Sequence, residues 1–418
     1  MALPEQPGRD KALSFEEQKG RHGNFFAIDR RTWARVCDLG MNPAVAYLVQ
    51  ARGTGADNRT TSWSTNAIEK YTGISRGRAK ESVQALVTNG MSKRTRDGSM
   101  PRYDLLPFHE LPSGNTRPTR EPMTDKQRPV YELVKRGDQP TGKDRQFANT
   151  LTHNGWLTRD SNGVFHANDD AEPKADWIWL PNELVTGAGD ETPPVELVRQ
   201  TRDVMTLRLL VDFYHGQNLR EDGGISRRHT YQEFERHKVG QQGQYIVWGF
   251  GADNTVVAWS DLTKCHERAR RDLTKEEKEA GKNPGVDFFR RLESLDTLGL
   301  IEWVPYLFEG DDADAEPIHP YGIGMSDTLE GRLYQAADTA GAGLITEGQR
   351  EWARENGLHL VPVPRHMANV QLIGIARLRY RPKTKTTAAW WGETQSSGEE
   401  YIRRYTESTA GKALKAVS

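Results

Sequence analysis

The chain has few cysteines and no long apolar run, and these absences exclude several classes of protein. Its 418 residues include only two cysteines, Cys37 and Cys265, which lie far apart. Two cysteines cannot build a disulfide framework, so we expect a cytoplasmic protein. No stretch approaches the roughly eighteen uninterrupted apolar residues of a membrane span. Residues 1–23 have mixed charge and no apolar segment, so we expect a polar N-terminal arm there, not a secretory signal.

The sequence patterns of common catalytic and metal-binding sites are also missing. The segment QPTGKDR lacks the leading glycine and the spacing of a phosphate-binding loop. The chain has no CxxC pair, no HxH pair and no HExxH motif, so it offers no recognisable ligand set for zinc or for a metal-dependent nuclease. We therefore expect that the protein is not an enzyme and that it binds neither a cofactor nor a metal ion.

The charge is balanced over the whole chain but uneven along it. The formal net charge is −1, which argues against a protein that coats nucleic acid with its entire surface. Residues 59–145, however, contain 17 Lys and Arg against 10 Asp and Glu. A local basic face is therefore expected in this region.

Residues 64–91 show the pattern of two short helices joined by a tight turn. Ser64 is a candidate N-cap for a helix over residues 65–71, and Gly73 is expected to end that helix. Ser75 is the candidate N-cap of the second helix. The second helix has an apolar stripe at helical spacing, made of Ala79, Val83, Leu86 and Val87.

Basic and amide side chains lie off this apolar stripe, towards the start of the second helix. In a helix-turn-helix the second helix enters the major groove of DNA, and its N-terminal residues meet base edges. Arg pairs bidentately with guanine and Gln with adenine. Ser75 is predicted to contact the DNA backbone, and the predicted base-reading residues are Arg76, Arg78, Lys80 and Gln84.

A hairpin is expected directly after this helix, because a DG dipeptide separates two short strand-like segments. A hairpin in this place is a wing that touches phosphates. The basic residues predicted to hold the DNA backbone there are Lys93, Arg94, Arg96 and Arg102. With the strand and the apolar helix upstream, residues 24–110 resemble a winged helix-turn-helix domain. The resemblance implies binding of double-stranded DNA, and the alternative is a purely structural or protein-docking role.

Residues 173–308 repeat parts of this plan. The sequence predicts an apolar helix within 204–226, a basic helix over 227–240, two strands around a turn within 244–260, and a helix followed by glycine and a strand within 286–308. The last of these helices carries Asp287, Glu293 and Asp296, which phosphates would repel. This second winged helix is therefore expected either to touch the DNA backbone through Arg227 and Arg228 or to mediate dimerisation or partner binding.

The remaining segments complete the predicted organisation. They are a basic linker (111–130), a small helix-hairpin module (131–172), an insertion in the second winged helix (240–285), an acidic loop (309–319) and a C-terminal extension (320–418). The extension contains two strand-like segments, and Arg377, Arg379 and Arg381 at the end of the second one are further candidates for backbone contact.

The predicted fold class is α+β, with two winged helix-turn-helix domains and a mixed, strand-containing C-terminal extension. Tandem winged helices joined by a basic linker resemble the replication initiators of plasmids and related mobile elements. The resemblance implies sequence-specific binding of double-stranded DNA, a homodimer through the second winged helix and contacts with replication proteins. The alternatives are a transcriptional regulator that contacts transcription proteins and an adaptor that binds proteins through its winged helices. No membrane association is expected.

Overall fold

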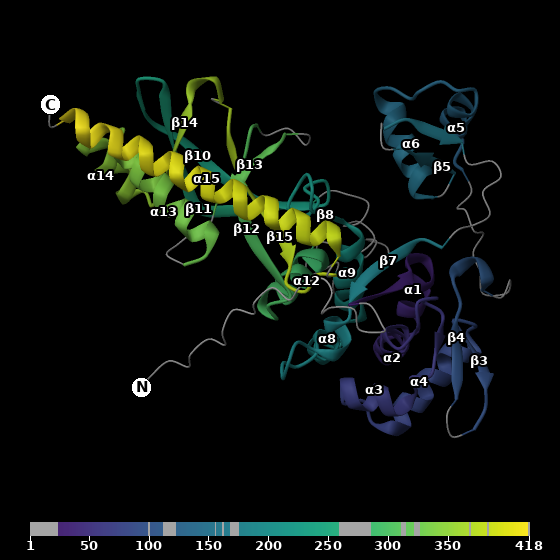
Figure 1. Ribbon diagram of the computed structural model, residues 1–418. Coiled ribbons are helices and arrows are strands. Elements are labelled where there is room, and N and C mark those ends of the chain that lie inside the picture. Colours follow the sequence, from purple (N-terminus) through teal and green to yellow (C-terminus); the bar gives the residue numbers. More distant parts are fainter. Residues whose placement is uncertain are drawn as a thin grey trace, which may run out of the picture. The chain divides into compact units, whose positions relative to one another are not determined.

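The computed structural model describes most of the chain beyond residue 23. It forms two compact units, an N-terminal unit of residues 26–178 and a C-terminal unit from residue 179 onward, to which residues 24 and 25 also belong. Both contain helices and strands, so the fold is mixed α and β (Figure 1). The described residues are 24–98, 101–111, 123–154, 156–160, 163–167, 175–258, 286–310, 315–321, 327–367, 369–382 and 384–416. The predicted arm, most of the basic linker and parts of the insertion and of the acidic loop fall outside these ranges.

The first part of the N-terminal unit is built around a buried helix, α2. The segment AVAYLVQA within it is apolar almost throughout, and all of its residues are buried, as expected of a helix that is apolar on every side. Helices α3 and α4 both pack against α2. The elements of this part are β1 (Phe25–Asp29), α1 (Arg30–Asp38), α2 (Met41–Arg52), β2 (Thr60–Thr61), α3 (Thr65–Thr72), α4 (Arg76–Thr88), β3 (Ser92–Arg96), β4 (Arg102–Leu105) and the 3-10 turn η1 (Phe108–Glu110).

The predicted helix pair is present as α3 and α4, and Gly73 ends α3 with a φ of 63°. The predicted side-chain caps are wrong. Ser64 and Ser75 occupy the N-cap positions, but neither side chain makes a capping hydrogen bond. Their backbone carbonyls accept from the first helical turns instead, for Ser75 from the N–H of Ala79 at 2.9 Å.

The predicted hairpin is also present. Strands β3 and β4 pair in antiparallel fashion, and β2 joins the far side of β4, which gives the order β2-β4-β3. Tyr103 and Leu105 of β4 are buried and hold the hairpin against the unit. Gly98 of the DG turn has a φ of 111°, a backbone conformation that glycine adopts without strain.

The second part of the N-terminal unit is a small helix-hairpin module with a core of its own. Two helices and a short antiparallel hairpin follow one another along the chain. They are α5 (Arg128–Lys135), α6 (Lys143–His153), β5 (Leu157–Arg159) and β6 (Phe165–Ala167). Its buried core consists of Val130, Tyr131, Val134, Ala148, Leu151, Leu157 and Phe165.

The C-terminal unit contains a six-stranded antiparallel sheet in the order β13-β12-β15-β10-β11-β14. Strand β15 lies between β12 and β10, so residues of the predicted C-terminal extension supply an inner strand of this sheet. The strands are β10 (Thr230–Gln242), β11 (Tyr245–Ala258), β12 (Ile301–Phe308), β13 (Pro317–Pro320), β14 (His359–Pro364) and β15 (Gln371–Leu378), with β7 (Trp177–Pro181), β8 (Gln217–Asn218) and β9 (Gly224–Ile225) outside it.

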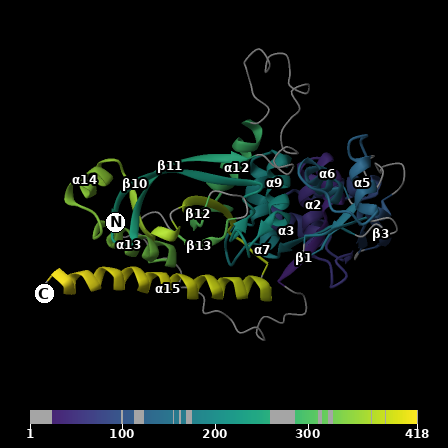
Figure 2. The same ribbon diagram turned by 90° about the horizontal axis from the view of Figure 1, so that it is seen from above.

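Helices cover this sheet, and the long helix α15 runs beside α13 (Figure 2). Leu329 and Leu333 of α13 and Tyr405 of α15 join sheet residues in one core. No helix in the described part of the chain is both long and apolar enough to cross a membrane. The helices are α7 (Glu183–Thr186), α8 (Pro194–Gln200), α9 (Val204–His215), α12 (Val286–Thr297), α13 (Leu329–Ala342), α14 (Glu347–Glu355) and α15 (Lys385–Ala416).

The structure corrects two predictions in this unit. Residues 227–240 were expected to form a basic helix, but most of them belong to strand β10, which pairs with β11 along nearly its whole length and with β15. Pairing with neighbouring strands outweighs the weak local helical pattern. Residues 244–260 were expected to contain two strands, but residues 245–258 form the single strand β11. The hairpin turn lies earlier, at Gly243. Of the predicted turn at 251–254, Asn254 pairs with Phe234, and residues 251–253 form a bulge opposite Glu235.

Candidate nucleic-acid interface

Helix α4 turns one face into the core and the opposite face to solvent. The buried side consists of Ala79, Ser82, Val83 and Leu86. Two hydrogen bonds fix the turn before the helix. Thr72 donates its hydroxyl to the carbonyl of Ile68 at 2.5 Å, and the N–H of Ile74 donates to the Thr72 hydroxyl at 3.2 Å. The buried Ile74 side chain anchors the three-residue turn, so the start of α4 has a defined position in this unit.

All four predicted base-reading residues are exposed on α4. Arg76, Lys80 and Gln84 follow one another at intervals of four residues and therefore form one row along the helix. Arg78 lies on the other flank of the same solvent face. The Gln84 amide donates to the Thr88 hydroxyl at 3.1 Å. The structure thus brings the four side chains to one surface, in a row of three with Arg78 beside it.

Sequence reasoning missed one residue of this surface, Glu81. It is exposed on the solvent face between Gly77 and Gln84, and helical periodicity alone would have placed it there. A carboxylate in this position can accept a hydrogen bond from the amino group of cytosine. It also reduces the positive charge of the surface, because residues 64–105 contain eight Lys and Arg against four Asp and Glu.

The β3–β4 hairpin presents all four predicted backbone-contact residues to solvent. Lys93 and Arg94 lie on β3, while Arg96 is paired with Arg102 across the hairpin. Two like charges directly opposite each other repel, which favours binding of an anion between them. The Arg94 guanidinium contacts the carboxylate of Asp97 at 2.9 Å, an exposed ion pair that a competing phosphate can replace.

A further arginine beside the hairpin has a different role. Arg59 donates both of its terminal nitrogens to the carboxylate of Glu110, at 2.7 and 2.5 Å. This bidentate hydrogen bond holds the pKa of Glu110 below its ordinary value. Arg59 therefore connects β2 to the turn η1 and is not part of the candidate interface.

The structure places the two predicted backbone contacts of the C-terminal unit in different environments. Arg228 is exposed. Arg227 is buried, with 5% of its side chain accessible, and its Nε donates to the carboxylate of Asp222 at 2.8 Å. Its guanidinium also donates to the carbonyl of Ala315 at 2.6 Å and stacks 3.9 Å from the ring of Phe308. Arg227 lies in the core of the unit and cannot reach a phosphate there.

Three other arginines of the C-terminal unit form contacts within it, among them the predicted candidates Arg377 and Arg379. Arg377 is buried and donates to the hydroxyl of Tyr306 at 2.7 Å, and Arg379 contacts Glu191 at 2.8 Å. On α12, Arg291 contacts Asp203 at 2.8 Å, and Asp203 also caps α9. Burial alone would raise the pKa of Asp203, but its bonds to Arg291 hold the pKa below the ordinary value. The buried Arg377 and Arg291 support the packing of the unit, whereas Arg379 is exposed and forms a surface ion pair.

The described residues contain no group of three or more His, Cys, Asp or Glu side chains that could hold a metal ion. No family model, curated protein or solved structure matches the chain. We therefore infer the function from the chemistry and geometry of the exposed surface formed by α4 and the β3–β4 hairpin.

Proposed function

We propose that residues 24–110 form a winged helix-turn-helix that binds double-stranded DNA in a sequence-specific manner. In this proposal α4 lies in the major groove and the β3–β4 hairpin follows the backbone. The observation that carries the proposal is that seven cations are exposed on these consecutive elements while the apolar residues of both face the core. The seven are Arg76, Arg78, Lys80, Lys93, Arg94, Arg96 and Arg102.

The row on α4 has the side chains that discriminate between base pairs. Arg76 is suited to the two acceptors of guanine, and Gln84 to the acceptor and donor of adenine. Each such bidentate contact contributes about 1–3 kcal/mol of discrimination. Exposed residues that served only solubility would not need an amide in line with two cations at successive helical turns.

The hairpin has the chemistry of a backbone contact, because it presents cations without amide side chains. Neutralising phosphates releases condensed counterions, so the affinity should fall with salt by about 0.9 logarithmic units per phosphate contacted. Ser75, which precedes α4, has an exposed side chain that makes no capping hydrogen bond. It remains our candidate for a further phosphate contact.

We propose replication initiation of a plasmid or mobile element as the biological role, on the resemblance of the sequence to that class. A homodimer through the C-terminal unit and contacts with replication proteins belong to the same proposal. A transcriptional regulator is the alternative with the same DNA chemistry. An initiator should select repeated sites, whereas a regulator needs a single promoter site.

The experiment is a selection of bound fragments from genomic DNA of the source, followed by fluorescence anisotropy on the enriched fragment. We expect Lys80→Ala/Gln84→Ala to lose about tenfold or more in affinity for that fragment. Arg354→Ala is the matched control, because it removes an exposed arginine from α14 in the other unit. If no fragment is enriched, or if affinity is indifferent to salt, the DNA proposal fails and a protein-binding adaptor takes its place.

A further inference from the structure

Helix α6 and its hairpin repeat the local geometry of α4 and its hairpin. At the end of α4 the N–H of Met91 donates to the carbonyl of Leu86 at 2.9 Å. At the end of α6 the N–H of Trp156 donates to the carbonyl of Leu151 at 2.8 Å. In both places an antiparallel hairpin follows the helix directly. These shared backbone bonds fix a common register, in which each residue of α6 corresponds to the residue 65 positions earlier.

In this register α6 repeats the chemistry of the proposed reading surface. Lys143 corresponds to Arg78, Arg145 to Lys80 and Asn149 to Gln84. On the hairpins, Arg159 corresponds to Arg94. Asn, like Gln, pairs bidentately with adenine. The two remaining positions carry a positive charge on both helices. Two buried positions also correspond, Ala148 to Val83 and Leu151 to Leu86, whereas the exposed Asp144 stands where Ala79 is buried.

The backbone bond alone is a common way to end a helix. Helix α5 has it as well, since the N–H of Asp138 donates to the carbonyl of Leu133 at 3.2 Å, and so do two helices of the C-terminal unit. Leu300 donates to Leu295 after α12, and Leu358 donates to Ala353 after α14. Helices α12 and α14, however, carry other kinds of side chain at the positions that correspond to Lys80 and Gln84 of α4. The residues that correspond to Lys80 and Gln84 are Phe289 and Glu293 on α12, and Glu347 and Glu351 on α14. On α5 the corresponding residues are Gln127 and Tyr131, so among these five helices only α4 and α6 carry a cation at the first place and an amide at the second.

The solvent face of α6 is available to a ligand. Its buried side, with Ala148 and Leu151, packs into the core of the module, while Lys143, Arg145, Gln146 and Asn149 are exposed. Within the described residues, no hydrogen bond or ion pair engages the side chains of these four. Three of them carry the guanidinium or amide groups that recognise base edges.

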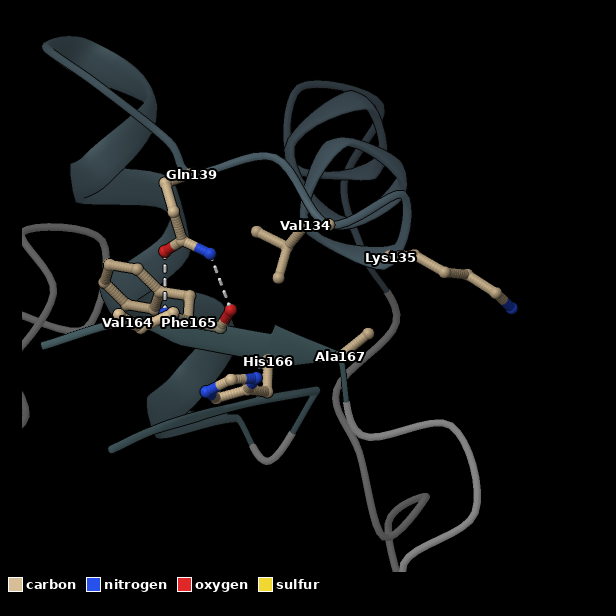
Figure 3. Close-up of a pocket in the computed structure, with 8 residues that line it drawn as sticks. Val134, Lys135, Gln139, Val164, Phe165, His166 and Ala167 are labelled. Atoms are coloured by element: carbon tan, nitrogen blue, oxygen red, sulfur yellow. Dashed lines mark hydrogen bonds between the residues drawn. The ribbon is translucent and has the colours of Figure 1, made fainter. Parts of the chain in front are cut away.

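The hairpin of the module is held firmly beside the start of α6. Figure 3 shows the Gln139 side chain paired with the backbone of Phe165, with its amide donating at 3.0 Å and its oxygen accepting at 2.8 Å. Gln139 thus connects the loop between α5 and α6 to strand β6 of the hairpin. Gln139 and Phe165 also line a pocket of about 490 Å³. The Arg159 guanidinium donates to the carbonyl of Gly163 at 3.2 Å and lies over the ring of Phe165.

We propose that α6 is a second DNA-reading helix, which contacts a further segment of the same duplex through Arg145, Gln146 and Asn149. Lys143 and the β5–β6 hairpin contact the backbone of that segment. This inference rests on the proposed function, in which α4 binds the same DNA duplex. It predicts a DNA footprint with two parts, one protected by α4 and the other by α6.

The test is a hydroxyl-radical footprint and an anisotropy titration of the full chain on the selected fragment. We expect Arg145→Ala/Asn149→Ala to lower affinity about ten- to a hundredfold and to erase protection over one part of the footprint only. Lys80→Ala/Gln84→Ala should erase a different part. Asn149→Ala alone keeps the charge, so a loss of affinity by this variant reflects base contact and not electrostatics. Thermal melting should be unchanged, since both side chains are exposed.

The outcomes separate the two proposals. If the α4 variant loses affinity while Arg145→Ala/Asn149→Ala retains full affinity and the complete footprint, α6 is not a reading helix and the proposed function stands. If the α6 variant alone loses protection, α6 reads DNA and the assignment of α4 is wrong. If the wild type selects no duplex, both proposals fail together.

Discussion

The carboxylate of Asp29 accepts a hydrogen bond from the backbone N–H of Phe108 at 3.3 Å, across 79 residues of sequence. The other oxygen of the same carboxylate caps α1 by accepting from the N–H groups of Arg31 and Thr32. Asp29 is buried, so both ends of the first part of the N-terminal unit depend on one side chain.

Replacing Asp29 with alanine should therefore destabilise the N-terminal unit. The loss of the cap and the unpaired buried N–H of Phe108 together cost about 2–4 kcal/mol. Urea unfolding of the full chain, followed by fluorescence, measures the change. Asp97→Ala removes an exposed carboxylate and serves as the control. An unchanged midpoint for Asp29→Ala would show that the unit does not depend on this connection.

The two halves of the proposed DNA surface should respond differently to mutation. Arg96→Ala and Arg102→Ala should weaken binding to all sequences equally, and each should lower the salt slope by about one. Lys80→Ala/Gln84→Ala should instead change which bases are preferred. Anisotropy at several salt concentrations, on the selected site and on unrelated duplexes, measures both effects. Equal loss of sequence preference in the hairpin variants would contradict the division of roles.

Arg227→Ala should affect stability rather than DNA binding. The substitution leaves the buried carboxylate of Asp222 without its partner, which costs about 3–5 kcal/mol. Chemical unfolding of the C-terminal unit measures the loss, and Arg228→Ala, at an exposed position, is the control. A stable Arg227→Ala protein with weakened DNA binding would return Arg227 to the DNA interface.

The C-terminal unit should lose stability in mild acid because of His319. Its Nε2 lies 2.9 Å from the hydroxyl of Tyr405 on α15, and burial lowers the pKa of His319 to about 4. The unfolded chain, with a histidine pKa of about 6.5, binds this proton more readily than the folded one. The contribution of neutral His319 to the free energy of unfolding is therefore complete above about pH 6.5. It declines as the pH falls towards about 4, by roughly 1.4 kcal/mol per pH unit.

Urea unfolding at several pH values between about 7 and 4 tests this expectation. Carboxylates titrate in the lower part of the same range, so the measurement compares the wild type with His319→Gln. The variant should show a shallower loss of stability between pH 6.5 and 5. Identical slopes for the two proteins would show that His319 does not contribute.

Local sequence determined the elements of the proposed DNA surface. The helix pair, its turn and the hairpin depend on short-range signals, namely Gly73 after α3, the apolar stripe of α4 and the DG turn. An exposed position on a short helix also follows from periodicity, so the predicted residues on α4 emerge at the surface. Glu81 also lies on that surface, and the same helical periodicity places it there.

Only the tertiary structure decided which strands of the C-terminal unit pair with one another. Residues 230–242 are a strand because β11 and β15 pair with them, and β15 begins about 130 residues later in the chain. No local pattern in this segment reveals such partners. The same long-range packing buries Arg227 between Asp222 and Phe308, whereas its sequence neighbour Arg228 stays exposed. A basic residue is available to DNA only if the fold leaves its side chain in solvent, and that depends on contacts between distant parts of the chain.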